Sequence, residues 1–116
     1  RRMAELPGFV IQKALKRADL TIDDMKVVEI NEAFAAVTLV STKILAEGYE
    51  AKWHEILKRT NPNGGAIAIG HPVGASGARI LLTMMYELKR RGGGYGVCGI
   101  CGGLAQGDCV VIKVDE

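Results

Sequence analysis

The chain has 116 residues, of which 48% are hydrophobic, and a formal net charge of +2 at pH 7. This length predicts one domain with a modest core. The near-neutral balance and the lack of a basic stripe interleaved with aromatics argue against a nucleic-acid partner. No apolar run approaches the roughly 20 residues of a membrane-spanning helix. The mean hydropathy of +0.14 predicts that more surface is buried than a lone monomer needs.

The three cysteines are Cys98, Cys101 and Cys109, and they lack the spacings of a secreted disulfide framework. They predict a reduced protein in the cytoplasm, or else in an organelle matrix. Cys98 and Cys101 form a C-x-x-C pair, but zinc needs a second pair or a histidine at ligand spacing. A thioredoxin-like site needs the pair at a helix start, whereas this pair lies in a predicted strand. Because the chain starts with Arg1-Arg2, we expect a fragment, a processed product or a truncated form.

The first half of the chain predicts helices around one strand. A proline in the first turn opens a helix over residues 7–18. The β-branched run 26–30 predicts a short strand. Residues 33–46 predict a buried helix, apolar nearly all round, that ends before Gly48. Residues 49–60 predict a short amphipathic excursion with its apolar side chains inward.

The second half predicts one strong helix and a hairpin. Residues 76–91 form the helix, and three glycines stop it. Residues 95–101 and 108–114 predict two strands joined by a tight connection of small residues. The order of these helices and strands along the chain predicts an α/β domain with helices layered on a mixed sheet.

His71 lies between Gly70 and Pro72 in a stretch dense in glycine, residues 63–79. Proline pushes the preceding residue toward extended backbone, so we expect a sharp turn just before a helix start, where free N–H groups favour negative charge. An imidazole there can carry a proton at neutral pH. A lone histidine is more often structural, but this glycine frame favours a functional role.

A dinucleotide-binding turn is an alternative for the same stretch, because Gly70, Gly74 and Gly77 loosely resemble its spacing. That site needs a strand–helix–strand unit and an acidic residue about 20 residues further on. The following strand ends in cysteine and glycine instead, with no such acid before Asp108. The spacing alone therefore gives this alternative little support.

Two further small motifs carry polar chemistry. Cys101 precedes Gly102-Gly103, whose backbone N–H groups could form an oxyanion hole or activate a thiol, whereas Cys109 stands in an apolar run typical of core packing. Asn31 stands where a strand passes into a helix. It could be a helix N-cap, or a binding group at the carboxyl end of a strand, and the spacing favours neither.

These motifs, in this order, resemble the C-terminal domain of the thiolase family over most of residues 1–116. Residues 31–35 are similar to its NEAF motif, and residues 64–79 match its long GGA-x-A-x-GHP-x-GASG-R motif. Residues 101–107 are similar to its C-x-G-x-G motif, although many members have three glycines where this chain has Gly103-Leu104-Ala105. Residues 49–60 are longer than the connection common in the family.

The resemblance implies a thiolase-like half with a mixed, five-stranded type of sheet, and a Claisen condensation of two acyl-CoA thioesters with its thiolytic reverse. Cys101 would be the acid/base that moves the α-proton. His71 would activate the nucleophilic cysteine and donate to the enolate oxygen, and Asn31 would hold a water beside that oxygen. These roles suit a reaction that needs a base, a nucleophile and a stabilised enolate.

The resemblance also implies substrate contacts and partners. The backbone N–H of Gly103 would join a second oxyanion hole, Phe34 would wall the acyl pocket, and Gly70 would contact substrate. Coenzyme A and acyl-CoA are the implied partners, with no metal or other cofactor, and a homo-oligomer is expected.

The acyl-accepting cysteine of the family stands in an N-terminal half that this chain lacks. We therefore expect the chain alone to be inactive. The other functions considered are a non-catalytic, thiolase-like module that binds acyl-CoA or lipid, and the dinucleotide-binding domain.

Overall fold

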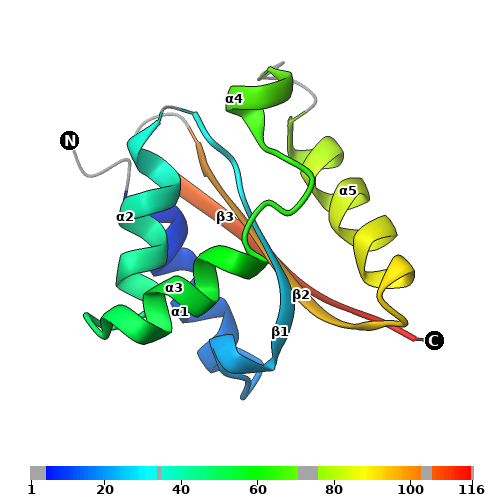
Figure 1. Ribbon diagram of the computed structural model, residues 1–116, viewed down its shortest axis with the longest axis horizontal. Coiled ribbons are helices and arrows are strands. Elements are labelled where there is room, and N and C mark those ends of the chain that lie inside the picture. Colours follow the sequence, from blue (N-terminus) through cyan, green and yellow to red (C-terminus); the bar gives the residue numbers. More distant parts are fainter. Residues whose placement is uncertain (1–4, 34, 71–75, 103–105, 116) are drawn as a thin grey trace.

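A three-stranded mixed sheet organises the molecule in the computed structural model (Figure 1). The structure describes residues 5–33, 35–70, 76–102 and 106–115, with the backbone alone at 76, 101, 102 and 106. The strands are β1 (Met25–Ile30), β2 (Gly94–Gly102) and β3 (Gln106–Val114). β1 pairs in parallel with β2, and β2 pairs antiparallel with β3. The α/β class and the mixed sheet predicted from the sequence are confirmed.

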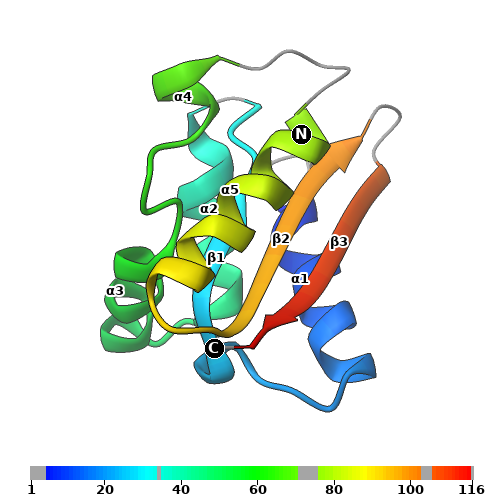
Figure 2. The same cartoon turned by 90° about the vertical axis from the view of Figure 1, so that its right-hand side faces the viewer.

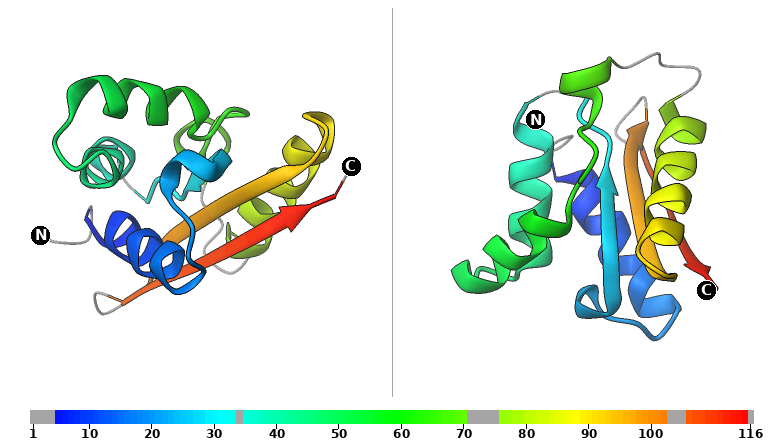
Figure 3. Two further views of the ribbon diagram at one scale, coloured as in Figure 1. Left: turned by 90° about the horizontal axis from the view of Figure 1, so that it is seen from below. Right: turned by 45° about the vertical axis from the view of Figure 1, so that its right-hand side comes forward.

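Helices cover both faces of this sheet, as the view from below shows (Figure 3). The helices are α1 (Leu6–Arg17), α2 (Ala36–Leu45), α3 (Glu50–Arg59), α4 (Ala66–Ile69) and α5 (Ser76–Arg90), with a 3₁₀ turn at Ile22–Asp24. α1 and α2 pack on one face and α3 packs on α2, whereas α5 lies on the other face. None of the helices within the described ranges is long and apolar enough to cross a membrane.

The core forms two clusters because side chains alternate along β1. Val28 and Ile30 belong to the larger cluster with α1 and α2. Val27 faces the other way and packs against the buried α5 side chains Ile80, Met84 and Leu88. A Cβ on Gly96 of β2 would meet Leu88 Cδ1 at 2.8 Å and Met84 Sδ at 2.9 Å. Because residue 96 is glycine, α5 can lie directly on the sheet. This packing holds α5, the helix that follows the His71 segment, in place.

The predicted elements are present, with three differences in detail. The second helix begins at Ala36 rather than residue 33. Residues 50–59 form a full helix with Ile56 buried, rather than a short excursion. Among the described residues the sheet has three strands, and Thr60 adds one isolated parallel bridge to Val28 on the outer side of β1.

The dinucleotide alternative is wrong on structural grounds. That site requires a strand running into the glycine-rich turn. Residues 66–69, which precede Gly70, form the short helix α4 instead.

Candidate active site

The candidate site lies at the end of the sheet where β1 and β2 end, which is also the end of the molecule that carries α4 and the start of α5 (Figure 2). Asn31 directly follows β1, and its side chain is fully buried. Its backbone N–H donates to the carbonyl oxygen of Gly99 at 3.0 Å, which continues the parallel pairing past the last residue of the strand. Cys101 stands two residues further along β2, where its Cα pairs with that of Gly107. The two motifs are therefore neighbours through the backbone of β2.

The helix-cap alternative for Asn31 is excluded. Ala35 occupies the N-cap position of α2, and the helix begins at Ala36. Asn31 is instead in a tight turn in which the N–H of Ala33 donates to its carbonyl oxygen at 3.1 Å. The residue thus belongs to the carboxyl end of β1, where α/β proteins place binding groups.

A side chain that the sequence motifs did not indicate ties the glycine-rich segment to β1. The Asn61 side chain accepts from the N–H of Ile30 at 2.8 Å and donates to the Ile30 carbonyl oxygen at 2.9 Å. Its backbone N–H donates to the Val28 carbonyl oxygen at 2.8 Å, and its φ of 48° turns the chain away from the sheet. Asn61 therefore closes the outer edge of β1 just before Asn31.

Glu32 makes the second tie to the same segment. Its Oε1 accepts a hydrogen bond from the N–H of Ile67 in α4 at 3.2 Å, and its Oε2 accepts one from the Thr38 hydroxyl of α2 at 3.4 Å. Gly65 lies directly beside the carboxylate, because an added Cβ would overlap Glu32 Oε1 and lie 2.7 Å from Cδ. Glu32 stands within the motif at residues 31–35, but the sequence assigns it no role.

Gly70 ends α4 with a conformation that favours glycine. Its φ is 95°, and its N–H donates to the Ala66 carbonyl oxygen at 2.7 Å. A side chain at this φ would be strained. Gly70 therefore turns the chain at the end of α4, whereas the turn predicted at His71 lies outside the described residues.

Three of the six predicted site residues, His71, Phe34 and Gly103, lie outside the described residues. The structure describes Asn31 and Gly70 in full and Cys101 by its backbone. Asn31 directly follows β1, Cys101 is the last residue but one of β2, and Gly70 directly follows α4, the helix at the end of the molecule where β1 and β2 end (Figure 2).

A buried carboxyl group lies behind Asn31. Glu29 is fully buried on the α5 side of β1, two residues before Asn31 and next to Cys98 of β2. Burial raises the pKa of Glu29 to about 7, and the charges of Glu32 and Glu87 add to the rise, while Arg79 in the first turn of α5 opposes it. Among the described residues, neither carboxylate oxygen of Glu29, nor Nε or Nη1 of Arg79, has a hydrogen-bond partner. This carboxyl group can therefore change its charge near neutral pH.

The two cysteines with described side chains, the buried Cys98 and the half-buried Cys109, have raised pKa values. Burial raises the pKa of Cys98 to about 11 and that of Cys109 to about 12. Since the thiolate is the nucleophile, neither residue suits acid/base or nucleophilic work at neutral pH. Within the described part of the chain, no group of three or more His, Cys, Asp or Glu side chains could hold a metal ion.

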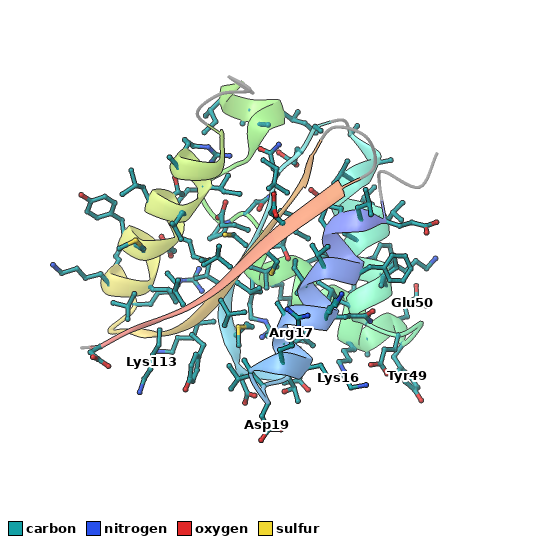
Figure 4. The ribbon with its side chains drawn as sticks, turned by 180° about the vertical axis from the view of Figure 1, so that it is seen from behind. Lys16, Arg17, Asp19, Tyr49, Glu50 and Lys113 are labelled. Atoms are coloured by element: carbon teal, nitrogen blue, oxygen red, sulfur yellow. The ribbon has the colours of Figure 1, made fainter. Side chains whose placement is uncertain are left out.

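One surface groove lies away from this end. It has a volume of about 550 Å³ and lies between α1, the 3₁₀ turn and α3. Its lining mixes charges of both signs, among them Lys16 and Asp19, which lie at the end of the molecule opposite α4 (Figure 4). No group of like charges there selects an anionic or a cationic ligand.

Comparison with known proteins defines the class. Residues 1–114 match the family described as thiolase, C-terminal domain. The chain therefore belongs to the thiolase family, as its three motifs predict. A probable acetyl-CoA acetyltransferase of Mycolicibacterium smegmatis is 51% identical over 107 residues, covering 92% of this chain and 26% of that protein. A beta-ketoadipyl-CoA thiolase of Acinetobacter baylyi is 46% identical over 113 residues, covering 97% of this chain and 27% of the relative.

Solved structures give the same fold. Human mitochondrial 3-ketoacyl-CoA thiolase in complex with CoA superimposes with a TM-score of 0.85 at 43% identity, over 98% of this chain and 27% of that one. The peroxisomal 3-ketoacyl-CoA thiolase of Saccharomyces cerevisiae gives 0.83 at 37% identity, over 97% of this chain and 30% of that one. The chain thus spans about a quarter of the length of the curated relatives that it matches.

Proposed function

We propose that the chain is the C-terminal catalytic part of a thiolase, which transfers acyl groups between CoA thioesters. The observation that carries the proposal is the buried Asn31, joined through its N–H to Gly99 of the strand that contains Cys101. Both residues lie within the segment that matches the family.

The proposed chemistry divides among residues of the three motifs. The Cys101 thiolate takes a proton from the α-carbon of one acyl-CoA. The enolate oxygen accepts hydrogen bonds from His71 and from a water held by Asn31. The α-carbon then attacks the acyl group on the cysteine of the companion part, and that cysteine leaves as the thiolate. Preorganised donors of this kind contribute about 3–4 kcal/mol each to transition-state stabilisation in comparable sites.

The remaining site residues stabilise the tetrahedral intermediate or contact the substrate. The backbone N–H of Gly103 stabilises the oxyanion that forms when the acyl thioester is attacked. Phe34 and Gly70 contact the acyl substrate. Coenzyme A thioesters are the substrates, and the proposed site uses no metal.

The nucleophilic cysteine belongs to the companion part, by which we mean the portion of a thiolase that precedes the matched domain. The described cysteines do not replace it, because the pKa values of Cys98 and Cys109 are far above neutrality. The exposed face of α5 supports such a partner, since Leu82, Met85 and Tyr86 are 52%, 43% and 72% exposed. Apolar side chains grouped on one face mark an interaction surface.

The proposal is tested by combining this chain with the companion part of the Mycolicibacterium smegmatis relative, by co-expression. Loss of acetoacetyl-CoA in the presence of CoA is followed for the pair and for each part alone. We expect turnover by the pair and none by either part. Comparable turnover by this chain alone, or none by a pair that associates, would refute the proposal.

A further inference from the structure

Glu32 connects the two motifs that flank the site, although no catalytic role is assigned to it. We propose that Glu32 is a positioning residue, whose carboxylate holds the segment leading to His71 against the turn that carries Asn31. This inference rests on the proposed function for its catalytic meaning. Its structural part stands on the contacts of Glu32 alone.

The first observation is the hydrogen bond from Ile67. α4 has only four residues, so most of its N–H groups must find partners nearby. The N–H groups of Ala68 and Ile69 both donate to the Gly65 carbonyl oxygen, at 3.0 and 3.1 Å. The N–H of Ile67 donates to Glu32 Oε1 at 3.2 Å. Glu32 therefore supplies an acceptor to a turn that ends one residue before His71.

The second observation is the fit at Gly65. The backbone there lies so close to the carboxylate that a Cβ would overlap Oε1 and come within 2.7 Å of Cδ. On its other side the same Cβ would lie 3.0 Å from Nδ2 of Asn61. Gly65 is thus enclosed between two side chains. Glu32 stands just after β1, and Asn61 is hydrogen-bonded to Ile30 at the end of β1. The close approach fixes where the segment starts.

The third observation is that Glu32 is itself held. Its Oε2 accepts from the Thr38 hydroxyl in the first turn of α2 at 3.4 Å, while the backbone on its N-terminal side is fixed by the bond from Asn31 to Gly99. A carboxylate bonded at both oxygens has little freedom to swing. Glu32 can therefore transmit the position of β1 and α2 to α4.

Replacing the Glu32 carboxylate with an amide distinguishes a positioning role from a role in proton transfer. A glutamine at residue 32 keeps a carbonyl oxygen for Ile67, and its NH₂ group can donate to the Thr38 oxygen. It cannot exchange a proton. Glu32→Gln should therefore preserve the geometry, and Glu32→Ala should lose it.

The structural test uses amide hydrogen exchange in the 116-residue chain, read residue by residue by NMR. We expect Ile67 to exchange about tenfold faster in Glu32→Ala, and near the parent rate in Glu32→Gln. Gly65→Ala should also accelerate Ile67 with Glu32 intact. Gly77→Ala is the matched control, since its Cβ would meet no atom of the described residues within 4 Å. An unchanged Ile67 rate in both Glu32→Ala and Gly65→Ala overturns the proposal.

Amides of Val28 and Val97 in the sheet report whether each variant keeps its fold. If Glu32→Ala disrupts them, Glu32→Asp decides, because it keeps the charge but is one methylene shorter. The same acceleration at Ile67 with an intact sheet supports the proposal, and parent-like exchange contradicts it.

The functional test uses the chain combined with its companion part. Glu32→Ala should lower kcat by about tenfold to a hundredfold, as misplacement of a catalytic group does, with little change in KM. Glu32→Gln should restore kcat. A kcat that stays low in Glu32→Gln would assign Glu32 to proton transfer instead. If the combined protein has no turnover at all, the proposed function fails while the exchange result still decides the positioning role.

Discussion

The backbone N–H of Asn31 donates to the carbonyl oxygen of Gly99 at 3.0 Å, so the end of β1 is joined to β2 two residues before Cys101. This bond brings together two motifs that are far apart in the sequence. The Asn31 side chain is fully buried at this end of β1.

Replacing Asn31 should slow the reaction of the combined protein. If Asn31 holds a water beside the enolate oxygen, Asn31→Ala should lower kcat by about a hundredfold. Asn63→Ala is the matched control, because the Asn63 amide donates to Glu87 at 3.0 Å rather than to the site. The kcat of each variant is measured by acetoacetyl-CoA thiolysis per folded molecule. Equal kcat values for the two variants would contradict the catalytic role assigned to Asn31.

Glu29 should make the chain less stable as the pH rises. Its pKa in the folded chain is about 7, above the ordinary value of 4.5, with burial as the main cause. The folded state therefore binds the proton more tightly than the unfolded state. Its stabilising effect is complete below about pH 4.5 and is lost as the pH rises through about 7. The loss amounts to about 3 kcal/mol.

Urea unfolding of the chain and of Glu29→Gln between pH 4.5 and 8 measures this effect. Glutamine cannot ionise, so the variant should lack the decline and should exceed the parent in stability at pH 8. The same decline in both proteins would show that Glu29 does not titrate in this range. Arg79, Glu32, Glu87 and Cys98 are the charged or titratable groups that interact with it.

Glu87 should have the opposite pH dependence. Its pKa is lowered to about 2, mainly by the hydrogen bond from Arg90, with further bonds from Arg91 and Asn63. Its stabilisation is therefore present above about pH 4.5 and is lost as the pH falls toward 2. Glu87→Gln should destabilise the chain at neutral pH by about 1.5–3 kcal/mol.

The control for Glu87 is a pair of exposed charges. Glu55 pairs with Lys58 at 3.5 Å, and both side chains are about two-thirds or more exposed, at 67% and 73%. Glu55→Gln should change the free energy of unfolding by less than about 0.5 kcal/mol. Equal losses in the two glutamine variants would contradict the role assigned to Glu87.

Cys98 and Cys109 should react slowly with alkylating reagents. Their pKa values of about 11 and 12 leave very little thiolate at pH 8. Mass spectrometry after a timed iodoacetamide pulse should show both residues far less modified than a cysteine in a short unstructured peptide. Modification at the peptide's rate would contradict their burial.

The sequence predicts the outline of the fold better than the contacts of the site. The apolar spacing of α5 and the β-branched runs of β1 and β3 are local signals, and these elements form where predicted. The start of the second helix is misplaced by three residues because Asn31 stays with the sheet. α4 has only four residues between glycines, which is too short for a periodic pattern.

The roles of Asn61 and Glu32 depend on residues far along the chain. Asn61 bonds to Ile30 across 31 residues, and Glu32 bonds to Ile67 across 35. No spacing rule connects such positions, because the contacts exist only once β1 and the glycine-rich segment are packed together. Family resemblance assigns roles to Asn31, His71 and Cys101, whereas the contacts of Asn61 and Glu32 are visible only in the structure.

The most direct test of the proposed chemistry is deuterium exchange at the methyl group of acetyl-CoA, catalysed by this chain combined with its companion part. The exchange reports removal of the α-proton without the later steps. We expect exchange in the parent and in Cys98→Ala, because Cys98 is a buried thiol with a raised pKa. We expect none in Cys101→Ala. Exchange that persists in Cys101→Ala would contradict the assignment of the base and, with it, the proposed function of this site.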